Sequence, residues 1–210
     1  MIKGVISDWD GCLYNSMHAV LKTYSAISGR PFEEISKAYT PNWRKFEKDE
    51  NVPRVSVEEW NRIFKKHSTT LKLFPGARGC LQRIKADGRK LAIATSANLS
   101  RIDRELKRLR LSHVFDAVVT LEDVENIKPD PECLEVAARK LGSKIEECVF
   151  VGDTNADASA AKNIGMRFIG VDWGYHPAQI IKKANKEARI VHDFSELYGT
   201  IKSFDKPRVR

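Results

Sequence analysis

Residues 1–16, MIKGVISDWDGCLYNS, decide the fold. A β-prone apolar run from Ile2 to Ser7 ends in two carboxylates, Asp8 and Asp10, with Gly11 directly after them. Residues two apart on an extended chain face the same way, so both acids can point to one spot. Such a pair is costly for folding unless a cation or a ligand uses it. The stretch therefore predicts the first strand of a buried sheet, with a functional site at its carboxyl end.

Strand-like and helix-like segments alternate along much of the remaining chain. Further strands are predicted at Lys90 to Thr95, Phe115 to Thr120, Cys148 to Gly152, Arg167 to Val171 and, more weakly, near Ile190. Asp130 and Pro131 predict the N-cap and first turn of a helix that Gly142 ends. A second helix is predicted from the apolar stripe of Leu99, Ile102, Leu106 and Leu109. Alternation of this kind implies right-handed crossovers and a mostly parallel sheet, which is an α/β, Rossmann-like core.

The interval from about Leu13 to Phe74 breaks the alternation. It is helical and aromatic, shows no strand pattern, and is too long for a plain connection between a strand and its crossover helix. We therefore predict a small all-helical cap, residues 14–74, inserted after the first strand of a core formed by residues 1–13 and 75–210. The cap's own small core is expected to contain Trp43, Phe46, Trp60 and Phe64, and any of them that faces the sheet could also shape the substrate pocket.

The composition is that of a globular protein with reduced thiols. Hydrophobic residues make up 42% of the chain and charged residues 30%, and no run approaches the roughly 18 apolar residues that span a bilayer. Asp8 and Asp10, directly after the apolar start, argue against a signal peptide or an anchor. The four cysteines are scattered, without the short spacings of a zinc site. We expect a cytoplasmic protein without a membrane partner.

The net charge of +8 comes from basic residues spread over the whole chain. Even a dense stretch such as RELKRLR (104–110) contains an acid. This pattern argues against nucleic acid as a partner. It favours a positive field that attracts a small anionic substrate. We expect a monomer or a homodimer.

Polar groups follow four of the predicted strands. In chain order they are Asp8, Asp10, Thr95, Ser96, Lys128, Asp153 and Asp157. Because the carboxyl ends of parallel strands meet at one edge of a sheet, these groups can converge on one pocket. Each alone is weak, since an acid pair or a Thr-Ser after a strand is most often a turn. Their order and spacing together indicate a site.

The residue types favour phosphoryl transfer. A few carboxylate oxygens, with room left for water and phosphate, suit Mg²⁺, which would relieve the repulsion among Asp8, Asp10 and Asp153. Lys128 and Thr95 can supply a positive charge and a donor to phosphate oxygens. One carboxylate can attack phosphorus while another moves protons. The set fits a reaction through a phosphoaspartate.

Four stretches resemble, in order, the motifs of the haloacid dehalogenase superfamily of phosphatases, in its phosphoglycolate-phosphatase-like branch. They are DWDGCLYNS (8–16), AIATSAN (92–98), KPDPECLEVAARKLG (128–142) and CVFVGDTNADASAAKNIG (148–165). The resemblance covers the core; the cap has the placement of the family's helical cap but no sequence that we can match. It implies a magnesium-dependent phosphatase that hydrolyses a small phosphate monoester, phosphoglycolate-like or a sugar phosphate.

The resemblance also assigns roles to residues of this chain. Asp8 would be the nucleophile, and Asp10 the general acid and base. The metal would be held by Asp8, Asp153 and the backbone carbonyl of Asp10. Asp157 would support the metal by contacting its direct ligands or through water. The phosphoryl group would be bound by Thr95, Ser96 and Lys128, with Lys128 also steadying the Asp8 carboxylate.

The chain departs from the family pattern at two positions. Cys12 stands where the family has Thr, and Asn15 where Asp is common. We interpret both as tolerated substitutions; altered cap gating or substrate preference is the alternative. Two other functions stay open at this point. One is a sugar-phosphate mutase of the same superfamily, and the other is a non-catalytic binding module that uses the basic surface.

Overall fold

A six-stranded, wholly parallel sheet forms the centre of the protein, in the strand order β3-β2-β1-β4-β5-β6. The structure, a computed structural model, describes residues 1–205. The strands are β1 (Gly4–Ser7), β2 (Lys90–Ala94), β3 (Ala117–Val119), β4 (Cys148–Gly152), β5 (Arg167–Val171) and β6 (Arg189–Val191). β1 lies between β2 and β4, so Ser7 is opposite both Ile93 and Val151. The predicted α/β fold with a parallel sheet is confirmed.

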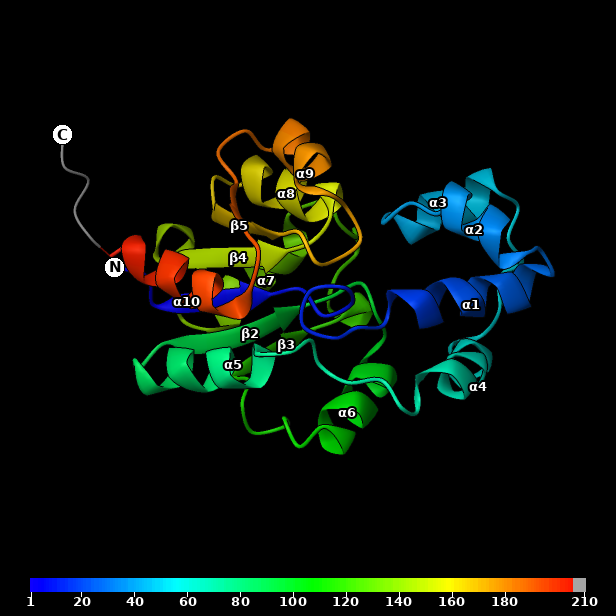
Figure 1. The fold of residues 1–210 in the computed structure, drawn as a ribbon, viewed down its shortest axis with the longest axis horizontal. Coiled ribbons are helices and arrows are strands. Elements are labelled where there is room, and N and C mark those ends of the chain that lie inside the picture. The colour runs from blue at the N-terminus through cyan, green and yellow to red at the C-terminus, as the bar shows by residue number, and fades with distance from the viewer. Residues whose placement is uncertain (206–210) are drawn as a thin grey trace.

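Helices cover both faces of the sheet (Figure 1). One face carries α5 (Ala77–Ala86), α6 (Leu99–Arg108) and α10 (Phe194–Ser203). The other carries α7 (Glu132–Lys140), α8 (Asn155–Asn163) and α9 (Ala178–Ala184). Two single-turn 3₁₀ helices, η1 (Leu121–Asp123) and η2 (Ile145–Glu147), complete the core. Each βα unit therefore delivers the end of its strand to the same edge.

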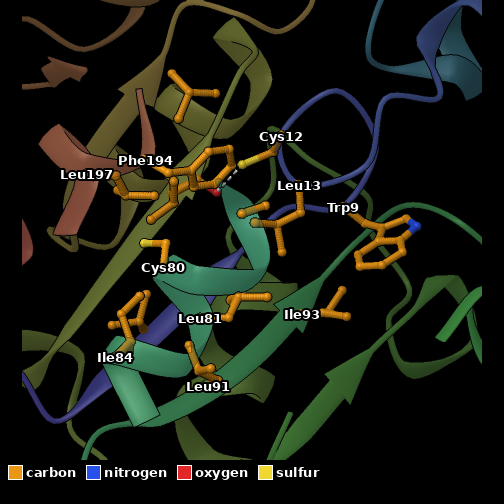
Figure 2. Close-up of a cluster of buried hydrophobic side chains, with 14 of the residues drawn as sticks. Trp9, Cys12, Leu13, Cys80, Leu81, Ile84, Leu91, Ile93, Phe194 and Leu197 are labelled. Atoms are coloured by element: carbon orange, nitrogen blue, oxygen red, sulfur yellow. Dashed lines mark hydrogen bonds between the residues drawn. The ribbon is translucent and has the colours of Figure 1, made fainter. Parts of the chain in front are cut away.

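The loop after β1 is anchored in the hydrophobic core of the first face. Figure 2 shows Trp9, Cys12 and Leu13 packed among side chains of α5, β2 and α10. Trp9 and Cys12 are fully buried, and the Cys12 thiol lies 3.7 Å from the Val151 carbonyl oxygen. Apolar side chains of this loop thus point into the core on either side of Asp10, which fixes the loop against the sheet.

Four helices between β1 and α5 form a separate layer beyond the carboxyl ends of the strands (Figure 1). They are α1 (Met17–Ser28), α2 (Phe32–Ala38), α3 (Trp43–Asp49) and α4 (Val57–Ser68). They share a hydrophobic cluster of their own, in which Phe46 and Phe64 are buried while Trp43 and Trp60 are only partly buried. The exact division at residues 14 and 74 stays a prediction.

The structure corrects two details of the predicted helices. α7 begins at Glu132 with Pro131 at the N-cap position, and the Asp130 carboxylate accepts the Glu132 N–H at 3.0 Å. Leu99 does not join the buried stripe of α6: it is 53% exposed. As the first residue of α6 it lies at the carboxyl edge, beyond the part of the sheet that covers Ile102. Among residues 1–205, no helix combines the length and apolar character needed to cross a membrane.

Candidate active site

Asp8 directly follows β1, which lies between β2 and β4 in the sheet. Its backbone N–H continues the pairing with β4 by donating to the Val151 carbonyl at 2.8 Å, and the residue is 6% exposed. The Lys128 ammonium reaches it from the loop after η1, with Nζ 2.7 Å from Asp8 Oδ1. The same ammonium donates to the Ala94 carbonyl at the end of β2, at 3.3 Å. Segments 120 residues apart in the sequence thus meet at one buried ion pair.

Asp8 belongs to a cluster of three buried carboxylates. Ligand oxygens of Asp8, Asp153 and Asp157 all lie within 4.8 Å of one another. Asp157 is held by Thr154, the N-cap of α8, whose N–H and hydroxyl both donate to Oδ2, at 3.0 and 2.6 Å. Its other oxygen lies 2.7 Å from the Lys128 ammonium. The capping box of α8 thus fixes the third acid of the cluster.

The three carboxylates of the cluster outnumber the single ammonium, that of Lys128, described beside them. Burial raises the pKa of Asp8 to about 7, against the lowering effect of Lys128, and Asp157 raises it further. Burial, Asp157 and Asp8 hold the pKa of Asp153 well above its usual range. Burial lowers the pKa of Lys128, but Asp157 and Asp8 outweigh it, so this pKa also lies well above its usual value. One ammonium therefore faces three carboxylates that are buried together.

The cluster fits a small hard cation. Asp153 Oδ2 accepts the Tyr175 N–H at 2.7 Å, but Asp153 Oδ1 is buried without a hydrogen-bond partner among residues 1–205. The backbone closes tightly on this side chain at two glycines. A Cβ on Gly11, where φ is +79°, would lie 2.4 Å from Asp153 Oδ2, and one on Gly174 would lie 2.2 Å from Asp153 Cβ. An unpaired oxygen in a shell of carboxylates is suited to a divalent ion such as Mg²⁺.

Asp10 takes a different position from its neighbour in the sequence. Its carboxylate is not part of the cluster; both of its oxygens contact the Arg101 guanidinium, and the Ser16 hydroxyl donates to Oδ1. Arg101, on α6, also contacts Glu105 one turn on, with Nε and Oε1 3.2 Å apart. The prediction that Asp10 binds the metal through its backbone carbonyl is not tested by this cluster of side chains, in which the Asp157 carboxylate lies with those of Asp8 and Asp153.

Thr95 and Ser96 lie at the end of β2, beside the Lys128 ammonium. Thr95 is 3% exposed, and its hydroxyl accepts the Ala97 N–H at 3.2 Å. Both residues line one cavity, together with Asp8, Asp10 and Lys128. The structure therefore brings the predicted phosphate-binding residues and the predicted nucleophile to one place.

This cavity, of about 340 Å³, lies between the core and the four-helix layer. Its outer walls are rich in aromatic side chains: Tyr24, Tyr39, Trp43, Trp60 and Tyr175. Hydrogen bonds help to dock the layer on the core. The Tyr175 hydroxyl donates to the Tyr39 carbonyl at 2.9 Å, Arg44 donates to the Glu125 carbonyl at 2.6 Å, and the side-chain amides of Asn61 and Asn98 pair at 3.0 and 3.2 Å. A ligand here is enclosed from both sides.

Comparison with known families decides the classification. The model of the haloacid dehalogenase-like hydrolases matches residues 5–171. The chain belongs to this family. With the pyrophosphatase relatives described below, this makes it a phosphoric-ester hydrolase, which sets aside the alternative of a non-catalytic binding module.

Individual relatives agree with the family. The haloacid dehalogenase-like chain is 27% identical to pyrophosphatase PpaX of Halalkalibacterium halodurans over 215 residues, which cover 94% of this chain and 97% of the relative. It is 32% identical to pyrophosphatase PpaX of Bacillus cereus over 151 residues, which cover 72% of this chain and 61% of the relative. A hydrolase structure from Pseudomonas syringae superposes with a TM-score of 0.82 at 24% identity, over 96% of this chain and 98% of that chain. The similarity to the Pseudomonas syringae structure shows that the two chains share a fold.

The residues that hold the Asp10 carboxylate in this haloacid dehalogenase-like site, directly or through one another, were not predicted from the sequence. They are Trp9, Arg101 and Glu105, of which Trp9 donates its indole N–H to Glu105 Oε2 at 2.6 Å. The available signal was the i,i+4 pair of opposite charges on a predicted helix. Such a pair usually marks a solvated face, yet here both residues are 2% exposed.

The two departures from the family pattern lie away from the cavity. Cys12 faces the core beneath the loop (Figure 2), and its carbonyl accepts the Trp173 indole N–H at 2.9 Å. Asn15 is exposed, and its backbone N–H donates to the Lys72 carbonyl at 3.2 Å. Neither side chain is among those that line the cavity. Their positions favour the interpretation as tolerated substitutions.

Proposed function

We propose that this phosphatase is magnesium-dependent and hydrolyses a small phosphate monoester through a phosphoaspartate on Asp8. One observation carries the proposal: Asp8, buried at the end of the central strand, lies 2.7 Å from the Lys128 ammonium, within a cluster completed by Asp153 and Asp157. A carboxylate in that position can attack phosphorus while the ammonium compensates the charge of the phosphoryl oxygens.

The chain's own residues divide the work of the reaction. A phosphoryl group on the cavity floor meets the Lys128 ammonium and the Thr95 hydroxyl, with Ser96 beside them. An Asp8 oxygen forms the new bond to phosphorus as the bond to the leaving oxygen breaks, and Asp10 gives that oxygen a proton. Asp10 then takes a proton from the water that attacks the phosphoaspartate, which releases phosphate and restores Asp8.

Asp8, Asp153 and Asp157, with the backbone carbonyl of Asp10, would hold the Mg²⁺ ion. When bound, the ion supplies positive charge that lowers the repulsion between an anionic nucleophile and an anionic phosphate. Asp157 joins the list because its carboxylate lies in the cluster. The donor set consists of hard oxygens, as Mg²⁺ prefers.

The cavity between core and cap receives the leaving group. Its volume of about 340 Å³ leaves space beyond the phosphoryl site for an alcohol of the size of glycolate or of a sugar. Aromatic walls suit the apolar faces of a sugar ring, and two cap arginines among the lining residues, Arg44 and Arg54, suit an additional anionic group. The four cysteines, all free and buried, fit a reducing compartment, and we place the enzyme in the cytoplasm.

The test is hydrolysis of a panel containing phosphoglycolate, hexose and pentose phosphates, and inorganic pyrophosphate, the last because relatives are named pyrophosphatases. We expect phosphate release from at least one ester with Mg²⁺, its loss with EDTA, and a fall of at least about a thousandfold in Asp8→Asn, since nucleophile deletions have effects of that order or larger. Undiminished turnover by Asp8→Asn would exclude the nucleophile assignment.

The sugar-phosphate mutase remains the second candidate because the cap is docked over the cavity, which would keep a phosphorylated intermediate away from water. The same panel separates the two functions. A mutase would convert one sugar phosphate into its isomer with little free phosphate, whereas the proposed phosphatase releases phosphate in proportion to the ester consumed.

A further inference from the structure

The Asp10 carboxylate is held by a residue that the proposed reaction does not yet use. Both of its oxygens contact Arg101 Nη2, and the Ser16 hydroxyl donates to Oδ1. Asp10 and Arg101 both line the cavity. The position of the proposed proton carrier is therefore set by α6 as well as by its own loop.

Arg101 is itself rigidly placed. It is 2% exposed, and the N-terminus of its helix is capped by Asn98, whose side chain accepts the Arg101 N–H at 2.9 Å. Glu105 lies 3.2 Å from its Nε and is in turn fixed by the Trp9 indole at 2.6 Å. Trp9 lies between Asp8 and Asp10 in the sequence, so the chain of contacts from Asp10 through Arg101 and Glu105 returns to the catalytic loop.

The same guanidinium touches the cap. It lies 4.4 Å from the ring centre of Phe64 and 5.4 Å from that of Trp60, both on α4. Next to it, the Asn61 amide donates to Asn98 Oδ1 at 3.0 Å and to the Ser100 hydroxyl at 2.8 Å. A planar cation can stack on a ring and hydrogen-bond a carboxylate at the same time, which a lysine cannot do equally well. Arg101 thus contacts both Asp10 and the docked cap.

We propose that Arg101 is a positioning residue for proton transfer: it aims the Asp10 carboxylate and makes that aim depend on the docking of α4. The inference rests on the proposed role of Asp10. When α4 is docked, Phe64 and Trp60 hold the guanidinium against Asp10. When α4 leaves, the guanidinium loses these rings, and Asp10 loses its orientation. Proton transfer is thereby confined to the state in which the cap covers the substrate.

A comparison of two leaving groups tests this role. Nitrophenolate leaves p-nitrophenyl phosphate without needing a proton, whereas an alkoxide leaving an alkyl ester of the panel needs one. In Arg101→Met we expect single-turnover cleavage of the alkyl ester to slow by about 10- to 100-fold, less than the roughly 10²- to 10⁴-fold of a whole general acid or base, because Asp10 itself is retained. The first release of nitrophenolate keeps its rate, followed by slow steady turnover, because the second step needs Asp10 as a base.

Matched variants exclude a merely structural effect. Arg101→Lys keeps the charge but not the planar fork, and we expect partial rescue. Arg108→Met removes another guanidinium of α6, one that donates to the Tyr14 hydroxyl and the Leu71 carbonyl, and should keep the wild-type ratio of the two rates. Phe64→Leu removes the ring but not the Asp10 contact, and should slow alkyl-ester cleavage by a few fold. Thermal melts check that each variant is folded.

The outcomes are separable. Equal loss of the nitrophenolate burst and of alkyl-ester cleavage in Arg101→Met would show a structural role and overturn the inference. Wild-type kinetics on both substrates would overturn it as well. Wild-type alkyl-ester cleavage in Phe64→Leu would overturn the coupling to the cap. If Asp10→Asn keeps full activity, Asp10 is not the proton carrier, and both that part of the proposed function and the inference fail. If Asp10→Asn is inactive but Arg101→Met is unaffected, only the inference fails.

Discussion

At the residue scale, the site depends on how closely the backbone approaches Asp153. Gly11 and Gly174 border this side chain, and at neither position is there room for a Cβ. Gly174 lies in the loop after β5, next to Tyr175, whose N–H fixes Asp153 Oδ2. Backbone and carboxylate are therefore packed as one unit, and a single added methyl group should displace a proposed metal ligand.

The substitution Gly174→Ala tests this packing. The new Cβ would lie 2.2 Å from Asp153 Cβ, so Asp153 must move. We expect the Mg²⁺ concentration for half-maximal activity to rise by about tenfold or more, the scale seen when partners of metal ligands are lost. Gly79→Ala, on α5, meets nothing within 4 Å and is the matched control, with Mg²⁺ dependence unchanged. Identical Mg²⁺ titrations for both variants would contradict the packing argument.

The residue scale also shows what sequence patterns can and cannot predict. Asp8, Lys128 and Asp153 were predicted from motifs because Asp8 and Asp153 directly follow strands and Lys128 lies in the connection that follows a third, and the sheet brings such positions together. Their roles in catalysis stay predictions. Arg101 was not found, because its proximity to Asp10 arises from the packing of α6 against the loop after β1, and no local pattern encodes that packing.

At the scale of elements, the strands were predicted well and the cap poorly. β4 and β5 match their predicted bounds, since buried parallel strands are continuous apolar runs flanked by turns. The cap was predicted only as a helical insertion. Which of its aromatic residues face the cavity depends on how four short helices pack, and Trp43 and Trp60 line the cavity instead of lying fully inside the cap's core.

The contact between the cap and the loop after β5 gives a prediction at this scale. Tyr175→Phe removes the hydrogen bond from the Tyr175 hydroxyl to the Tyr39 carbonyl but keeps the ring against Tyr39, at a centroid distance of 5.5 Å. A hydrogen bond of this kind contributes about 0.5–1.5 kcal/mol. We expect KM for the best ester to rise by about 2- to 10-fold, because docking of the cap is weakened.

The melting temperature of Tyr175→Phe should stay close to that of the wild type, since the cap and the sheet each keep their own hydrophobic cluster. Steady-state kinetics and a thermal melt measure both quantities. A lower melting temperature with an unchanged KM would show that this contact stabilises the fold and does not control access to the cavity.

At the scale of the whole molecule, the acid cluster links stability to pH and to metal. Without a cation, burial raises the pKa of Asp8 from 3.8 to about 7, and it raises the pKa of Asp153 well above its usual range. Between the unfolded and folded pKa values, the native protein binds more protons than the unfolded chain. Stability of the metal-free protein therefore falls as pH rises through this window and levels off above it.

Thermal melts with EDTA or Mg²⁺ test this linkage. With EDTA we expect the melting temperature to fall between about pH 5 and pH 7.5. Mg²⁺ should raise it more at about pH 8 than at about pH 5, because protons compete with the cation at the lower pH. In Asp8→Asn, which cannot ionise, the fall with pH should be smaller. A melting temperature that rises over this range with EDTA, or an equal effect of Mg²⁺ at both pH values, would contradict the linkage.

The measurement that tests the central claim most directly is the capture of the phosphorylated enzyme. In Asp10→Asn the proposed base for the second step is absent, so p-nitrophenyl phosphate with Mg²⁺ should phosphorylate Asp8 faster than water removes the group. After a rapid acid quench, mass spectrometry of the peptide that contains Asp8 should find one phosphoryl group on that residue, in proportion to the nitrophenolate released. Release of nitrophenolate without a phosphoryl group on Asp8 would contradict the account.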